Sequence, residues 1–322
     1  MVRFAVAGFG CLLALFGAAR AEVWPERPIT LIVPYAAGSP ADTIGRLLAE
    51  QMTGTLGQRV VIENTPGAGG TIGSARVAKA PPDGYLLVQG GTGTHAQSQT
   101  LYKTPPYDAA SDFTPVALIG ESPLVLVARK DLSANDLRSF IAYAKTNPTT
   151  YGSAGVGSST HLSCALLTSA AGFDAIHVPY RGMGLVIQDI TAGRVDFACD
   201  FVLDALPQVQ AGNIKTLAVL TKKRSDALPN VPTADEQGLA GFDAYNWNAV
   251  FLPKGTPEAI TKKLNAALVR ALDAPAIKDT FSKLGVVIPP PEHRTPEYLG
   301  AFVKSEITKW SAPIKASGAT AQ

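Results

Sequence analysis

Cysteine is scarce in this 322-residue chain, and its scarcity excludes two kinds of protein. The three cysteines are too few for the disulfide framework of a small secreted scaffold. None of them has the close Cys or His spacing of a metal site, so we expect no bound metal. Cys11 lies in an N-terminal apolar run, which leaves Cys164 and Cys199. The sequence does not decide whether these two form a disulfide or remain buried thiols.

An excess of charge of one sign is also missing. The chain has 28 Lys and Arg against 26 Asp and Glu, interspersed along its length. Nucleic-acid binding needs a basic stripe, so we expect no nucleic-acid partner. The glycine-rich run 66–73 lacks the lysine and hydroxyl residue of a phosphate-binding P-loop. No G-x-S-x-G elbow or Asp/His pair completes a catalytic triad, so we expect no catalytic residues and no cofactor.

Long hydrophobic runs are confined to the start of the chain. Arg3 precedes an apolar run over 4–18, and Ala19-Arg20-Ala21 fits a small-x-small cleavage site. This pattern predicts a signal peptide over residues 1–21, cleaved near Ala21, and therefore an exported protein. No later run is long and apolar enough to span a bilayer.

One stretch near the start of the mature chain has the pattern of a strand, a tight loop and a helix. Its first part, 29–33, is an apolar and β-branched run typical of a buried strand. Ser39 is a favourable N-cap, Pro40 takes the first helical position, and Asp42 follows three residues after the cap. The free N–H groups of such a helix start suit an anion. An ordinary α/β turn without a ligand would have the same pattern.

The same device recurs in the middle of the chain. A short strand at 151–153 leads into a loop rich in glycine and serine, and a helix follows over 160–171. Because each unit places a helix start at the carboxyl end of a strand, we expect Gly38-Ser39 and Ser158-Ser159 on opposite walls of one cleft.

Strands and helices alternate along the mature chain, which indicates an α/β fold with a parallel or mixed sheet and flanking helices. Apolar runs over 116–128 and 247–252 predict two strands that cross between two lobes. We therefore expect lobe 1 to combine 22–123 with 246–322, lobe 2 to comprise 124–245, and the ligand cleft to lie between them.

A series of motifs follows in register with one known family. The motifs are Trp24-Pro25-Glu26-Arg27-Pro28, Pro34-Tyr35-Ala36-Ala37-Gly38 with Asp42, Glu63-Asn64-Thr65-Pro66-Gly67, Pro82-Asp83-Gly84-Tyr85, Gly152-Ser153-Ala154-Gly155-Val156-Gly157 and Val178-Pro179-Tyr180-Arg181-Gly182. With them the chain resembles the Bug family, the solute-binding proteins of tripartite tricarboxylate transporters. The resemblance implies a type II-like periplasmic binding protein that captures a small carboxylate, most of all a dicarboxylate. It also implies delivery to the permease subunits in the membrane, and we expect a monomer.

Carried over by position, the resemblance implies which residues bind the ligand. The first wall would comprise Tyr35, Gly38, Ser39 and Asp42, flanked by Thr92, and the facing wall Gly157, Ser158, Ser159, Thr160 and His161, with Tyr180 and Asp200 beside them. Ser39 stands where the family often has a second glycine, so the exact ligand stays open.

Alternatives remain for three of these residues and for the function. Asp42 fits helix capping better than ligand contact, because a carboxylate would repel an anion. His161 could contact the ligand or only lie near the helix start, and Asp200 could bind ligand or cap a loop. A periplasmic sensor that presents a carboxylate to a signalling partner fits the same fold. A secreted α/β hydrolase would need a nucleophile and base that we do not find.

Overall fold

The computed structural model describes residues 24–316 and 318–321, so the expected signal peptide lies outside the described residues. Within them, the strands form one mixed sheet in the order β2-β1-β3-β9-β4-β7-β5-β6, and β8 also pairs with β4. The strands are β1 (Ile29–Val33), β2 (Val60–Asn64), β3 (Leu86–Gly91), β4 (Phe113–Arg129), β5 (Thr150–Ser153), β6 (Ile176–Pro179), β7 (Phe197–Phe201), β8 (Ile214–Val219) and β9 (Tyr245–Pro253).

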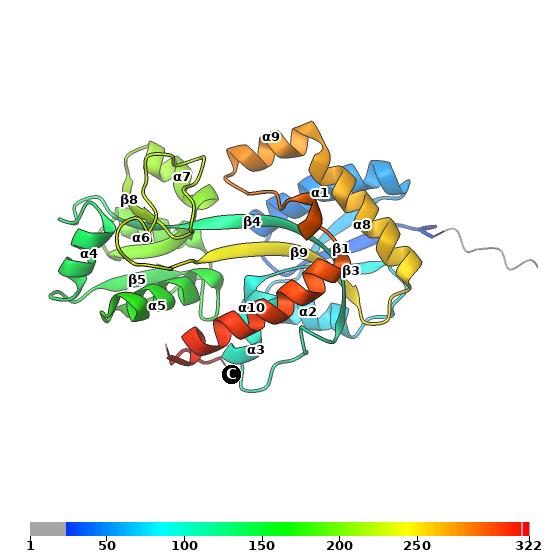
Figure 1. The fold of residues 1–322 in the computed structure, drawn as a ribbon, viewed down its shortest axis with the longest axis horizontal. Coiled ribbons are helices and arrows are strands. Elements are labelled where there is room, and N and C mark those ends of the chain that lie inside the picture. The colour runs from blue at the N-terminus through cyan, green and yellow to red at the C-terminus, as the bar shows by residue number, and fades with distance from the viewer. Residues whose placement is uncertain (1–23, 317, 322) are drawn as a thin grey trace, which may run out of the picture.

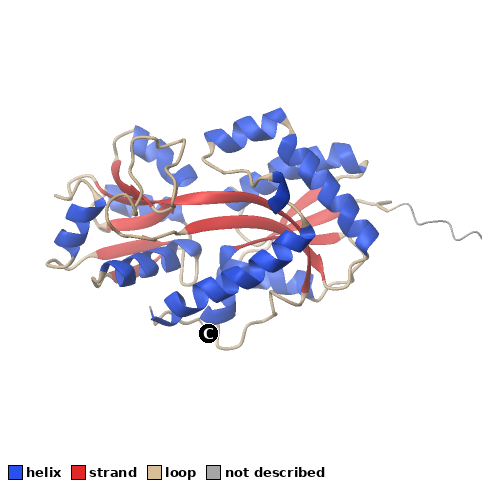
Figure 2. Ribbon diagram, viewed as in Figure 1, coloured by secondary structure: helices blue, strands red, loops and turns tan. Residues whose placement is uncertain are grey.

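Helices flank this sheet (Figure 2). The α-helices are α1 (Pro40–Leu56), α2 (Thr71–Ala78), α3 (Ser98–Leu101), α4 (Leu137–Ala144), α5 (Ser159–Ala171), α6 (Met183–Thr191), α7 (Val202–Gln210), α8 (Glu258–Asp273), α9 (Pro275–Lys283) and α10 (Pro296–Ala316). Shorter helical turns are η1 (Ala68–Gly70), the π-helical η2 (Gly93–Gln97) and η3 (Pro291–His293). In the part of the chain that the structure describes, no helix combines the length and apolarity needed to cross a membrane.

The long strand β4 belongs to both halves of the sheet. Its residues 113–123 pair antiparallel with β9, and residues 124–129 pair with β7 on one side and β8 on the other. Figure 1 shows β4 and β9 side by side through the middle of the molecule. The two expected crossing strands are therefore present, and the run across Glu121-Ser122-Pro123 is one continuous strand. We call the part with β1–β3 and β9 the first half, and the part with β5–β8 the second half.

Helix α1 shows how the first half buries its core. Its apolar residues recur at helical spacing, and Ile44, Leu48 and Met52 are almost completely buried. They pack in one cluster with β1 and with residues such as Leu268 from α8. Gly57 ends the helix in the left-handed conformation, with φ of 71°. The amphipathic pattern thus fixes which face of α1 meets the sheet and directs its N-terminus toward the centre of the molecule.

The C-terminal helix α10 packs along the crossing strands. Its Glu306 is buried and accepts hydrogen bonds from Trp247 Nε1 (3.0 Å) and Trp310 Nε1 (3.2 Å). The indole of Trp247 on β9 is thereby fixed to the helix. Helix α10 also contacts α5 of the second half.

The second half contains a disulfide between Cys164 on α5 and Cys199 on β7, with a Cα–Cα distance of 5.4 Å. Both residues are completely buried. Of the two alternatives that the sequence left open, the structure therefore has the disulfide. The bond ties the helix that begins at Ser159 to the strand that ends at Phe201.

Candidate functional site

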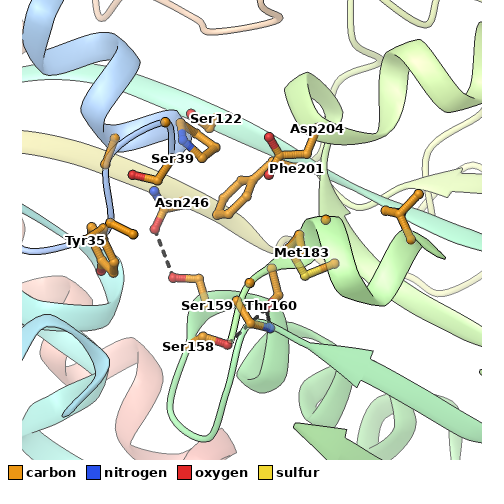
Figure 3. A pocket seen from close by; sticks show the side chains of 18 of the residues that line it. Tyr35, Ser39, Ser122, Ser158, Ser159, Thr160, Met183, Phe201, Asp204 and Asn246 are labelled. Atoms are coloured by element: carbon orange, nitrogen blue, oxygen red, sulfur yellow. Dashed lines mark hydrogen bonds between the residues drawn. The ribbon is translucent and has the colours of Figure 1, made fainter. Parts of the chain in front are cut away.

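A cavity of about 840 Å³ lies where the two halves meet. It is walled by the loop before α1, the loop before α5, one face each of α6 and α7, and the crossing strands β4 and β9 (Figure 3). Its polar lining residues are Ser39, Ser122, Ser158, Ser159, Thr160, Arg181, Gln188, Thr191, Asp204, Gln208, Asn246 and Asn248. Aromatic and aliphatic surface comes from Tyr35, Met183, Ile187 and Phe201, among others.

The first wall is the loop from β1 into α1. Ser39 is the N-cap of α1, and its Oγ accepts a hydrogen bond from the amide of Asp42 (3.3 Å). Gly38 precedes it with φ of 81°, a conformation that costs glycine little. Pro40 has no N–H and the amide of Thr43 donates to the carbonyl of Ser39 (3.0 Å), so the amide of Ala41 is left without a helical partner at the edge of the cavity.

Asp42 holds this loop from behind and does not line the cavity. Its carboxylate accepts hydrogen bonds from the amide of Gly38 (2.8 Å), Arg46 Nε (2.9 Å) and Asn64 Nδ2 (3.0 Å). Burial alone would raise the pKa of Asp42, but these hydrogen bonds outweigh it and hold the pKa below its usual value. Of the two roles weighed for Asp42, the contacts match capping and loop support.

The second wall repeats this geometry. Ser158 is the N-cap of α5, its Oγ accepts from the amide of His161 (3.2 Å), and Gly157 precedes it with φ of 80°. His161 Nδ1 accepts a hydrogen bond from the amide of Gly157 (3.1 Å), as the Asp42 carboxylate does from Gly38. In both walls the side chain three residues after the cap therefore holds the glycine before the cap.

His161 is buried behind its loop and does not line the cavity. Its ring stacks on His177 at 4.0 Å between ring centres, and Ser153 Oγ lies 2.6 Å from His177 Nε2. Burial lowers the pKa of both histidines to about 4, and for His161 the charge of His177 adds to this. Neutral His161 can accept at Nδ1, whereas the protonated ring would present a donor to the Gly157 amide.

The crossing strands form the floor of the cavity. Asn246 on β9 accepts a hydrogen bond at Oδ1 from Ser159 Oγ (2.9 Å), the dashed line in Figure 3. Ser122 on β4 pairs with Asn246 in the sheet and also faces the cavity. The bond to Ser159 joins the second wall directly to a strand that belongs to the first half.

Half of the sequence-predicted site residues line the cavity. They are Tyr35, Gly38, Ser39, Ser158, Ser159 and Thr160. The others lie behind its walls: besides Asp42, Gly157 and His161, these are Thr92, Tyr180 and Asp200.

Those last three residues have partners elsewhere. Thr92 Oγ1 accepts from the amide of Trp247 (2.9 Å), and the Tyr180 hydroxyl donates to Asp189 (2.7 Å). Asp200 is completely buried, and one of its oxygens accepts from the amide of Phe201 (2.8 Å). Thr92 and Tyr180 thus fix neighbouring elements, and Asp200 lies next to the cavity wall.

Several lining residues were not expected from the sequence. Phe201 and Asp204 come directly after β7, so the rule that ligands bind at the carboxyl ends of strands could have found them. Nothing local marks Ser122 or Asn246, because they lie within strands and reach the cavity only through the crossing of β4 and β9. Arg181 lines the cavity from the loop before α6.

The lining of the cavity is suited to binding a small polar ligand. Its charged lining residues are Arg181 and Asp204, and most of its polar groups are hydroxyls and amides. No group of three His, Cys, Asp or Glu side chains within residues 24–316 and 318–321 could hold a metal ion. A polar cavity beneath two helix starts, at the crossing of two sheet halves, defines a two-lobed solute-binding protein of the α/β type.

Comparison with known proteins identifies the family. The model of the tripartite tricarboxylate transporter family receptor matches residues 44–319. The structure of the periplasmic binding protein BugD is 36% identical, with a TM-score of 0.85, and the match covers 93% of this chain and 100% of BugD. The chain therefore belongs to the Bug family, the receptors of tripartite tricarboxylate transporters, as the resemblance predicted.

Two further structures of similar proteins contain ligands. MatC from Rhodopseudomonas palustris, with bound malate, is 41% identical with a TM-score of 0.84, over 90% of this chain and 100% of MatC. A second R. palustris protein, with adipate, is 34% identical with a TM-score of 0.85. The match covers 92% of this chain and 99% of the R. palustris chain. These matches confirm the expected α/β fold with a mixed sheet and flanking helices.

Proposed function

We propose that this protein captures a small carboxylate, and preferentially a dicarboxylate, in the cavity. It then delivers this ligand to a tripartite tricarboxylate-type permease. In this proposal the mature chain is a periplasmic monomer, released by cleavage near Ala21, and it returns its ligand chemically unchanged. The expected lobes, 22–123 with 246–322 and 124–245, would close over the ligand about β4 and β9.

The observation that carries the proposal is the pair of serine-capped helix starts, at Ser39 and Ser158, in the wall of one cavity. A helix N-terminus has roughly half a positive charge and stabilises a nearby anion by about 0.3–2 kcal/mol. Hydrogen bonds to a charged group contribute about 1.5–3 kcal/mol each. The summed free energy of several such bonds exceeds the cost of association, which is about 4–15 kcal/mol. A buried arginine or lysine is therefore not required to hold the ligand.

The ligands of the relatives support the same class of cargo. MatC contains malate and the second R. palustris protein contains adipate, and both are dicarboxylates. Two helix starts on opposite walls suit a ligand with one carboxylate at each end. Neutral donors also favour release, because hydroxyls and amides form no strong ion pair that the permease would have to break.

Calorimetry with malate and adipate tests the proposal. Ser39→Ala and Ser159→Ala should each weaken binding by about 1–3 kcal/mol, since each removes a hydroxyl from the cavity. Thr295→Ala is the matched control, because Thr295 Oγ1 accepts from the amide of Tyr298 at the start of α10, away from the cavity. It should cost stability and leave binding unchanged.

Arg181→Ala separates the two ways of holding an anion, because Arg181 is exposed and contributes a cation to the lining. Loss of binding in Arg181→Ala, with normal binding in both serine variants, would show that a salt bridge holds the ligand. Conversion of malate or adipate in proportion to protein concentration would contradict a receptor without enzymatic activity.

A further inference from the structure

A second cavity lies against the crossing strands. It has a volume of about 680 Å³, and we call it the rear cavity. Glu121 and Pro123 of β4 line it, whereas Ser122 between them lines the first cavity. Likewise, Tyr245 of β9 lines the rear cavity and Asn246 lines the first. Because successive side chains of a strand point to opposite faces, the two cavities lie on opposite faces of the same pair of strands.

Both halves of the molecule contribute to the rear cavity. Its wall from the second half is the segment 221–226, which follows β8. Its wall from the first half includes Ser282 of α9 and the segment 285–288. The amides of Glu121 and Val287 each donate to the other residue's carbonyl (2.9 and 2.8 Å), which fixes 285–288 to β4. A change in the angle between the halves therefore changes the width of the rear cavity.

No polar contact joins these two walls. In the described ranges, no hydrogen bond or ion pair links 221–226 to 278–288. Beside the cavity, Gly285 of the first half approaches Val202 of α7 so closely that a Cβ would lie 3.1 Å from Val202 Cγ1. Glycine has no side chain that could interlock with Val202. The width of the rear cavity is therefore not fixed by interactions across it.

The shared strands are irregular on both sides of the segment that separates the cavities. The pairing of β4 with β9 shifts register between Leu118 and Gly120, and its pairing with β8 shifts between Leu126 and Val127. Such shifts interrupt the ladder and bend the strand, and the segment 121–123 lies between them. Rotation about this segment brings the halves together on one face and separates them on the other. The first cavity then narrows as the rear cavity widens.

Resting on the proposed function, we infer that the rear cavity controls the affinity of the first cavity for its carboxylate. A group that fills the rear cavity holds the halves apart on that face and favours the form that is closed around the ligand. Because the closed form is the one that binds tightly, the apparent dissociation constant falls as this form becomes more populated. The group acts from across β4 and β9 without touching the ligand.

Larger side chains at position 282 test this inference. Ser282 is exposed on the last turn of α9 and lines the rear cavity, where Val287, 56% exposed, adds apolar surface. In calorimetry with malate and adipate, Ser282→Trp should bind about threefold more tightly than wild type, the gain if the closed form rises from about 10% to about 30% of the empty protein. Ser282→Leu should show a smaller gain. Ser305→Trp is the matched control, the same change at an exposed position of α10 that lines neither cavity, and it should bind as wild type does.

Small-angle scattering tests the same variants without ligand. Ligand-free Ser282→Trp should have a smaller radius of gyration than ligand-free wild type and Ser305→Trp, with circular dichroism confirming that each is folded. Ser282→Leu takes its place in this comparison if the larger side chain prevents folding. Equal or weaker affinity in both Ser282 variants overturns the inference and leaves the proposed function intact. If wild type binds neither malate nor adipate, the proposed function fails and the scattering decides, because an unchanged radius of gyration would overturn the inference as well.

Discussion

Breaking the bond between Cys164 and Cys199 should destabilise the protein without weakening its site. The disulfide closes a loop with a sequence separation of 35 residues. In the chain-entropy treatment, a loop of this length contributes about 4 kcal/mol at 25 °C by restricting the unfolded chain. The unfolding entropy of a mature chain of this size is about 0.6 kcal/mol/K. The melting temperature should therefore fall by about 6 °C.

The assay compares two preparations of the chain without residues 1–21, one oxidised and one unfolded, reduced and refolded in reductant. Thiol titration in denaturant should find no free thiol in the first and both cysteines free in the second. Thermal unfolding followed by circular dichroism then gives the difference in melting temperature. Because the effect acts on the unfolded chain, the affinity of the folded protein for a carboxylate should change little.

The matched control is Cys164→Ala with Cys199→Ala, which should melt at the same temperature with and without reductant. Equal melting temperatures of the oxidised and reduced wild-type protein, with the expected thiol counts, would refute the reasoning. A large loss of affinity on reduction would instead show that the bond maintains the wall at α5.

Two further predictions concern the second wall. His161 and His177 have pKa values of about 4 when folded and near 6.5 when unfolded, so the free energy of unfolding should fall as pH drops from about 6.5 to 4. Replacing both by Gln should flatten this slope; an equal slope in denaturant titrations contradicts it. Gly157→Ala should cost more stability than Gly172→Ala, because its Cβ would lie 2.3 Å from Leu101 Cδ2, whereas Gly172 has open space. Only Gly157→Ala should also weaken ligand binding, as calorimetry can check.

The sequence determines the local units of this protein. Strand, loop and helix around Ser39 and around Ser158 follow from apolar runs, a left-handed glycine and a capping serine. The hydrogen bonds that form the two caps join residues no more than four positions apart, as from Gly157 to His161. Contacts of this range leave a pattern in the chain, so both helix starts were predicted, together with the α/β class.

The tertiary structure decides which side of each unit faces the cavity. His161 and Asp42 lie near their caps in sequence but turn inward to hold the loops. Asp200, near the end of β7, is buried in the core, whereas Asp204 lines the cavity. Adjacent positions of a helix point about 100° apart, so a shift of one or two positions turns a side chain from the cavity to the core. Only the packing of α1, α5 and α7 against the sheet selects between these outcomes.

The floor of the site and the disulfide depend entirely on contacts between distant segments. Asn246 meets Ser159, 87 positions away, because β9 crosses beneath the second wall. Cys164 meets Cys199 because α5 packs on β7. No local pattern encodes such distances, since they follow from the sum of many packing interactions. The sequence thus determined two serine-capped helix starts, and the crossing of β4 and β9 decided that they share one cavity.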